Sequence, residues 1–119
     1  MITLKTLESA TDQEVFNQIA NHLISQNTKS SKDGGSFCHY RGSNNTKCAA
    51  GCIIADDEYK DCFEGKDWSQ MVRRGYATPR HEKLIIRLQL IHDGSLPTYW
   101  KRDLISLAES LNLDHSFIK

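Results

Sequence analysis

The sequence predicts an α+β fold that is mainly helical, with about three longer helices and short helical turns around one small β-hairpin. Three observations carry this prediction. Apolar residues recur at helical spacing in three stretches, helix-capping residues precede each stretch, and a run of turn formers separates two short arms near the middle of the chain. A length of 119 residues suits one hydrophobic core, so we expect a single domain over residues 1–119.

The first helix is predicted to start at Thr11. Thr11 and Glu14 have the spacing of a capping box, and the apolar residues that follow recur on one helical face as far as Asn27: Val15, Phe16, Ile19 and Leu23. Residues 28–36 then contain no apolar side chain and include a pair of glycines. This composition predicts a flexible loop at about 28–36, either a solvated connector or a segment that closes over a ligand beside it.

The hairpin is predicted from two arms, residues 37–41 and 47–54. They flank the turn formers at positions 42–45, Gly-Ser-Asn-Asn, and the second arm is expected to bend at Gly51. Because Ala49, Ala50 and Gly51 are small, the second arm is also compatible with a short helix.

Three further helical elements follow. A short one is expected near Trp68 after Gly65 and Asp67, and a helical turn is expected after Asp56. A stronger helix is predicted to open at Thr78 and Pro79 and to end at Asp93 and Gly94, with apolar residues over a wide arc: Leu84, Ile85, Ile86, Leu88, Leu90 and Ile91. Pro97 and Thr98 open the last long helix, whose inward residues are Trp100, Leu104, Leu107, Ala108 and Leu111.

Charge and composition exclude several functional classes. Lys plus Arg and Asp plus Glu number 15 each, so no overall field would draw the chain to nucleic acid or to an anionic membrane. The first residues lack the pattern of a signal peptide, and no apolar run approaches the roughly 20 residues that span a bilayer. We therefore expect a cytoplasmic protein in which thiols stay reduced.

The four cysteines, Cys38, Cys48, Cys52 and Cys62, are candidate metal ligands. Structural zinc sites bring their ligands as close pairs, and only Cys48 and Cys52 form such a pair here. Those two thiols can share an ion only if the backbone coils between them. His39 and His81 would complete the site if they lay nearby. Zinc is accordingly the candidate cofactor, and the alternative is that the cysteines are small buried apolar residues.

A thiol nucleophile is a second hypothesis. Cys48 follows a turn and precedes two alanines, so a helix starting there would lower its pKa. His39 and His81 are candidate bases, but no histidine is fixed to a thiol by spacing. The sequence therefore assigns no catalytic residue and favours a binding protein over an enzyme.

Candidate binding residues lie in two groups. Arg41 stands between Tyr40 and Gly42, where its guanidinium could receive phosphate or carboxylate, with Asp57, Glu58 and Tyr59 further along the segment. The alternative for Arg41 is an internal ion pair with Asp56, Asp57 or Glu58. Arg73 and Arg74 begin a basic cluster before the helix that opens at Thr78, and this cluster is either an anion pocket or a solvated face.

One stretch resembles a recurrent motif of small uncharacterised proteins encoded by tailed bacteriophages and their bacterial relatives. The residues that carry the resemblance are Cys38, Tyr40, Arg41, Gly42, Lys47, Cys48, Ala49, Gly51, Cys52, Ile53, Ile54, Asp57, Glu58, Tyr59, Glu64 and Gly65. Ala55 stands where the motif often has proline. The resemblance covers about residues 35–65.

The resemblance implies the cytoplasm of an infected bacterium and an accessory protein that acts by binding, in host takeover or counter-defence. Its partner would be a host bacterial protein that it inhibits or a small anionic ligand, such as a signalling nucleotide, that it sequesters. The alternatives are a zinc-stabilised interaction module and a small Cys/His-dependent hydrolase.

Overall fold

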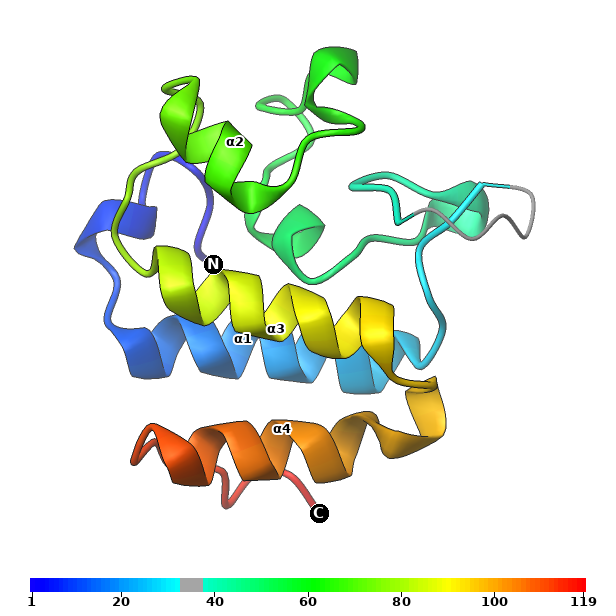
Figure 1. The fold of residues 1–119 in the computed structure, drawn as a ribbon, viewed down its shortest axis with the longest axis vertical. Helices are drawn as coiled ribbons and strands as arrows, with labels where there is room; N and C mark the ends of the chain where they lie inside the picture. Colours follow the sequence, from blue (N-terminus) through cyan, green and yellow to red (C-terminus); the bar gives the residue numbers. More distant parts are fainter. Residues whose placement is uncertain (33–37) are drawn as a thin grey trace.

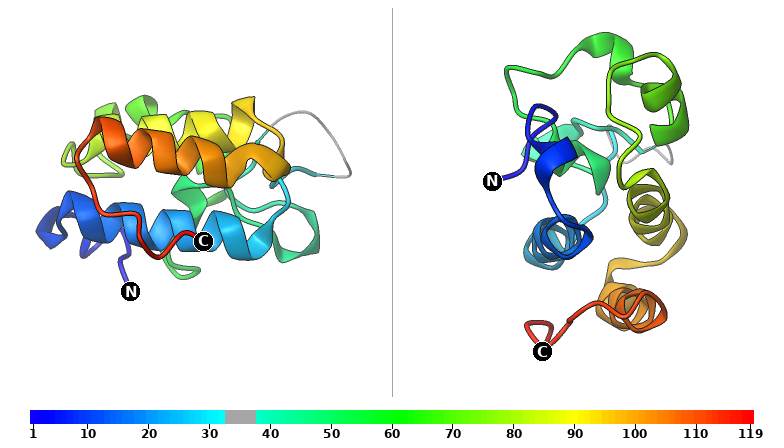
Figure 2. Two further views of the ribbon diagram at one scale, coloured as in Figure 1. Left: turned by 90° about the horizontal axis from the view of Figure 1, so that it is seen from below. Right: turned by 90° about the vertical axis from the view of Figure 1, so that its left-hand side faces the viewer.

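The described part of the chain, residues 1–32 and 38–119 of a computed structural model, contains helices and connecting turns but no strand. Its α-helices are α1 (Asp12–Gln26), α2 (Trp68–Arg73), α3 (Glu82–Gly94) and α4 (Trp100–Ser110). Short 3-10 helices are η1 (Leu7–Ser9), η2 (Ser43–Asn45), η3 (Ala50–Ile53), η4 (Asp61–Phe63) and η5 (Pro97–Tyr99). Helices α1, α3 and α4 pack side by side, and α2 and the coiled segment before it lie on the other side of α1 and α3 from α4 (Figures 1 and 2).

The predicted β-hairpin is wrong, although the mainly helical character is as expected. Within the described residues, the turn formers build η2, where Asn44 and Asn45 have positive φ, and the expected second arm coils into η3. Gly51 lies against the backbone of Tyr40, and a Cβ at position 51 would stand 2.5 Å from the Tyr40 carbonyl oxygen. Small side chains thus favour a coil that packs tightly over an extended strand.

Helix α1 confirms the first predicted helix. Thr11 accepts a hydrogen bond from the N–H of Glu14, the Glu14 side chain accepts one from the N–H of Thr11, and Asn27 closes the helix in the left-handed conformation. The predicted apolar face is fully buried. Helix α1 packs against α3 and α4 and also against η3, so it contacts both the helix bundle and the coiled segment that contains η3.

Helix α3 ends where predicted but begins later. Its first residue is Glu82, and the cap position is held by His81 at φ 66° rather than by Thr78. Leu90, predicted on the apolar arc, has 62% of its surface exposed, whereas His92 is buried in the core. Helix α4 likewise starts at Trp100, because Pro97 opens the short η5 before it.

The loop predicted at 28–36 is only partly described. Residues 33–36, and Phe37 at the start of the predicted hairpin, lie outside the described residues. Before them, Ser30 is fully buried, and its N–H donates a hydrogen bond to Nε2 of His92 at 3.0 Å. This end of the loop is therefore anchored to α3. No helix in the described ranges combines the length and the apolar character needed to cross a membrane.

Candidate functional site

Arg41 makes internal contacts that hold the coiled segment together. Its Nη1 donates to the carbonyl oxygens of Tyr40 and Gly51, at 3.2 and 2.9 Å, and its Nη2 donates to that of Ile54 at 2.6 Å. Nη2 also lies 3.1 Å from a carboxylate oxygen of Asp56, which confirms the ion pair considered as the alternative for Arg41. Because the Arg41 side chain is only 18% exposed, its planar donor group is largely committed to the fold.

Glu64 holds the same segment through backbone N–H groups. Glu64 accepts hydrogen bonds from the N–H groups of Tyr40 and Arg41, at 3.0 and 3.1 Å, and from the hydroxyl of Tyr59 at 2.6 Å. The Tyr59 ring lies under the Arg41 guanidinium, 5.0 Å from its centroid. These contacts make most polar residues of the motif part of its scaffold.

Glu58 attaches the N-terminal segment to this scaffold. Its carboxylate accepts hydrogen bonds from the N–H groups of Leu4, Lys5 and Ala55, at 2.9, 3.1 and 2.9 Å. Burial raises the pKa of Glu58, but these hydrogen bonds lower it by more. Asp57, in contrast, is exposed.

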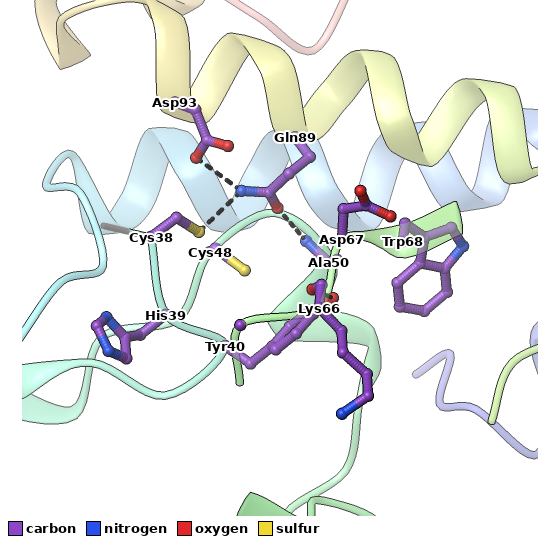
Figure 3. A pocket seen from close by; sticks show the side chains of 11 residues that line it. Cys38, His39, Tyr40, Cys48, Ala50, Lys66, Asp67, Trp68, Gln89 and Asp93 are labelled. Atoms are coloured by element: carbon purple, nitrogen blue, oxygen red, sulfur yellow. Dashed lines mark hydrogen bonds between the residues drawn. The ribbon is translucent and has the colours of Figure 1, made fainter. Parts of the chain in front are cut away.

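A pocket of about 510 Å³ opens beside the scaffold (Figure 3). We call it the thiol pocket, because Cys38 and Cys48 both line it. The other lining residues are His39, Tyr40, Ala50, Gly65, Lys66, Asp67, Trp68, Gln89 and Asp93. Its walls are mainly apolar and aromatic, with a few polar groups, which is typical of a small-molecule site.

Gln89 links α3 to two other lining residues of the thiol pocket, Ala50 and Cys38. Its Oε1 accepts the N–H of Ala50 at 3.0 Å, and its Nε2 donates to Sγ of Cys38 at 3.0 Å and to Oδ1 of Asp93 at 2.8 Å. Figure 3 shows Gln89 and Asp93 reaching from α3 toward Cys38. The amide therefore fixes the position of the Cys38 sulfur relative to the helix.

The Cys38 thiol is protonated at neutral pH. A hydrogen bond with Cys48, together with burial, raises the pKa of Cys38 far above its usual value. Cys48 is buried, and its sulfur accepts the N–H of Gly51 at 3.3 Å. Cys38 is thus a poor nucleophile at neutral pH, because only a thiolate attacks efficiently.

Cys38, His92 and Asp93 lie close enough to share a metal ion. One potential ligand atom from each lies within 4.8 Å of the others. Burial raises the pKa of Asp93, but hydrogen bonds from His92 and Gln89 lower it by more, so the carboxylate is ionised at neutral pH.

The hydrogen bonds of His92 define where its protons lie. Nε2 accepts the N–H of Ser30, and Nδ1 lies 2.8 Å from Oδ1 of Asp93, so Nδ1 carries a proton that it donates to the carboxylate. Burial lowers the pKa of His92, but Asp93 and Cys38 raise it by more. A charged ring would carry a proton on Nε2 as well, and that nitrogen could not accept the Ser30 N–H, so these two hydrogen bonds describe the neutral ring with its proton on Nδ1.

The remaining predicted thiol and histidine candidates lie elsewhere. The Cys52 thiol donates to the carbonyl oxygen of Ala49 at 3.2 Å, and burial raises its pKa to about 12. Cys62 is exposed and contacts the Tyr76 hydroxyl. The His81 ring contacts the Asp12 carboxylate and the Ala10 carbonyl. The structure therefore brings together two of the four predicted metal ligands, and His39 lies in the same pocket.

The predicted basic pair lies outside the thiol pocket. Arg73 and Arg74 are exposed at the end of α2. A separate pocket of about 500 Å³ lies at the start of α3, and half of its lining residues are charged: Asp12, Glu82, Lys83 and Arg87. Its wall composition fits a solvated cleft better than a small-molecule site.

Sequence reasoning missed Gln89, His92 and Asp93, which place the thiol pocket against α3. Their spacing of three and four residues puts them on one face of the helix, within an otherwise apolar stripe. That spacing was a usable signal. No protein-family model, curated protein or solved structure matches the chain.

Proposed function

We propose that this chain is a small binding protein whose contact site is the thiol pocket. In the setting that the motif resemblance implies, it is a phage accessory protein that acts in the cytoplasm of an infected bacterium, in host takeover or counter-defence. The observation that carries the binding role is the pocket of about 510 Å³ beside the motif. Pockets of this size hold ligands of nucleotide dimensions.

The composition of the pocket supports a small ligand over a broad protein surface. Tyr40 and Trp68 supply aromatic walls, and Lys66 and His39 supply groups that can contact the anionic part of a ligand. The carboxylates of Asp67 and Asp93 can accept hydrogen bonds from N–H or O–H groups of the same ligand, which a nucleotide also offers. Sequestration of a small anionic ligand, such as a signalling nucleotide, is therefore the form of the proposal that we favour. Inhibition of a host protein is the other outcome that the experiment below distinguishes.

A zinc-stabilised interaction module is a second candidate function, and the cluster of Cys38, His92 and Asp93 supports it. Metal analysis of freshly purified protein tests it, since a structural zinc site binds one ion per chain. The Cys/His hydrolase has less support. The Cys38 thiol stays protonated, and the proton on Nδ1 of His92 prevents that nitrogen from acting as a base.

Affinity capture from infected cells tests the binding proposal. Lys66 is half-buried and lines the thiol pocket, and its ammonium group donates to the carbonyl oxygen of Cys62. Lys66→Glu removes a positive charge from the pocket wall and should release the occupant, and a thermal melt like that of the wild type shows that the fold is intact. Lys101→Glu makes the same charge change on the exposed side of α4 and serves as the control. Mass spectrometry should find a small molecule, or a host protein, with the wild type and the control but not with Lys66→Glu. Equal recovery with all three proteins would contradict the proposal.

A further inference from the structure

Asp93 has one carboxylate oxygen that is occupied and one that is open. Its Oδ1 accepts hydrogen bonds from Nε2 of Gln89 and Nδ1 of His92, each at 2.8 Å, and these two donors use both lone pairs of that oxygen. Apart from the nearby Cys38 thiol, which is a weak donor, no described residue donates to Oδ2. The side chain lines the thiol pocket and is 42% exposed, so a ligand can reach this carboxylate.

Lys66 places a positive charge on the other side of the thiol pocket. Figure 3 shows Lys66 and Asp93 on opposite sides of the lining residues. The Lys66 ammonium group donates to the carbonyl oxygen of Cys62, which leaves two of its three N–H groups for a ligand. A ligand that spans the pocket therefore needs an anionic group at the Lys66 end and hydrogen-bond donors at the Asp93 end.

The other polar side chains near Asp93 are already committed to internal hydrogen bonds. Gln89 accepts the N–H of Ala50 and donates to Cys38 and Asp93, so both ends of its amide are engaged. The hydroxyl of Tyr40 donates to the carbonyl oxygen of Lys66 at 2.8 Å, so Tyr40 offers a ligand mainly its ring. Asp93 is thus the group on the α3 side of the pocket that can read the donors of a ligand.

The bases of nucleotides differ in the donors that they present to an acceptor such as Oδ2. Guanine presents its N1–H and its 2-amino group side by side. Adenine and cytosine place a ring nitrogen acceptor next to their amino group, and uracil has a carbonyl oxygen on each side of its N–H. Because a carboxylate oxygen only accepts, and has two lone pairs, it favours guanine over the other bases.

We propose that the thiol pocket binds a guanine nucleotide, with Oδ2 of Asp93 accepting the N1–H and the 2-amino group of the base and Lys66 contacting the phosphate. This inference rests on the proposed function and deepens it, because it names the base of the sequestered nucleotide. Gln89 and His92 act as positioning residues, since their hydrogen bonds to Oδ1 fix the direction of Oδ2. The Tyr40 ring supplies an apolar wall for the base.

Calorimetric titration of the purified wild type with three nucleotides tests the base preference. The ligands are guanosine monophosphate (GMP), inosine monophosphate (IMP) and adenosine monophosphate (AMP), and IMP differs from GMP only by the missing 2-amino group. We expect GMP to bind at least about tenfold more tightly than IMP or AMP, because hydrogen bonds to a charged acceptor are strong. Equal affinities for the three ligands, or no binding of GMP at millimolar concentration, would overturn the inference.

Asp93→Asn tests the residue that reads the base. The donors of Gln89 and His92 keep the amide oxygen at the Oδ1 position, so the amide nitrogen replaces Oδ2 and opposes the N–H groups of guanine. We expect at least a tenfold loss of GMP affinity, with GMP no longer preferred over IMP. Asp114→Asn is the matched control, because Asp114 is exposed and does not line the pocket. A wild-type preference for GMP in Asp93→Asn would contradict the assignment.

Lys66→Glu should weaken the binding of GMP and IMP by the same factor, because both ligands carry the phosphate. A change in the ratio of the two affinities would contradict the placement of the phosphate at Lys66. The comparison of GMP with IMP uses the wild type, so it remains valid if Asp93→Asn does not fold.

The outcomes separate the guanine assignment from the proposed function. If Lys66→Glu releases an occupant in the capture from infected cells but the wild type shows no preference for GMP, the assignment of guanine is wrong and the binding pocket stands. If GMP binds with the expected preference but the capture recovers the same material from all three proteins, the proposed role in infected cells fails and the guanine site stands.

Discussion

Gln89 and Ala50 form the hydrogen bond that joins helix α3 to η3: the side-chain oxygen of Gln89 accepts the N–H of Ala50 at 3.0 Å. Ala50 is buried, so without Gln89 its N–H would have no access to water. The same amide donates to Cys38 and Asp93. One side chain thus connects the motif segment, the pocket and the helix bundle.

Replacing Gln89 should destabilise the whole domain. We expect Gln89→Ala to lower the free energy of unfolding by about 1–3 kcal/mol, because it leaves a buried N–H without a partner. Urea denaturation measures this loss. Arg87→Ala, an exposed position on the same helix, is the control and should change the free energy by less than about 0.5 kcal/mol. Equal stability of the two variants would show that the Gln89 bond is dispensable.

Arg41 should behave as a structural residue. Arg41→Lys keeps the positive charge but loses the planar fork that reaches three carbonyl oxygens, so we expect a loss of about 1.5–3 kcal/mol. Arg73→Lys makes the same change at an exposed site and should melt like the wild type. An Arg41→Lys protein with unchanged stability and impaired ligand binding would instead restore the contact role predicted from the sequence.

Gly51 and Gly94 should respond oppositely to alanine. A Cβ at Gly51 would meet the Tyr40 carbonyl oxygen at 2.5 Å, so Gly51→Ala has to displace backbone and should cost about 1–3 kcal/mol. At Gly94, the last residue of α3, a Cβ meets nothing within 4 Å. Gly94→Ala should therefore stabilise the protein by about 0.4–1 kcal/mol. Thermal melting of both variants decides, and a Gly51→Ala protein as stable as the wild type would contradict the close packing of η3.

Glu58 should make stability depend on acid pH. Although burial raises its pKa, hydrogen bonds from three backbone N–H groups lower it below the ordinary value of 4.5. A carboxyl with a lowered folded-state pKa contributes stability above its unfolded pKa and loses that contribution as pH falls through the folded pKa. Wild-type stability should therefore fall below about pH 4.5, and Glu58→Gln should lower stability at neutral pH and show a smaller decrease on acidification.

Asp57→Asn is the control for Glu58, because Asp57 is its exposed neighbour. Denaturation curves collected from neutral to acid pH should follow the wild type for this variant. If Glu58→Gln and the wild type lost stability in parallel, the attachment of the N-terminal segment through Glu58 would be incorrect.

Local signals in the sequence were sufficient for part of the fold. The capping box of Thr11 and Glu14 predicted the start of α1, because both partners lie within one helical turn. The predicted hairpin was wrong because contacts between residues distant in the sequence decide the conformation of this segment. Glycine and asparagine favour tight turns of several kinds. Two of the three carbonyl groups that hold Arg41 in the coiled segment lie ten and thirteen residues beyond it, outside the range of local patterns.

The site was less predictable than the helices. The motif drew attention to Cys38 and Cys48, and both line the pocket. The residues that give these thiols their surroundings, Gln89 and Asp93, lie about fifty residues from Cys38 and reach it only after α3 packs against the motif segment. Sequence spacing carries no information about that docking.

Site-specific photo-crosslinking in infected cells tests the central claim, that the thiol pocket rather than the arginine of the motif is the contact site. A photoreactive residue at position 66 lies at the pocket, and one at position 101 lies on the exposed side of α4. We expect position 66 alone to yield an adduct, seen as an increase in the intact protein mass that matches a small molecule or a host protein. No adduct at position 66, or equal adducts at both positions, would contradict the claim.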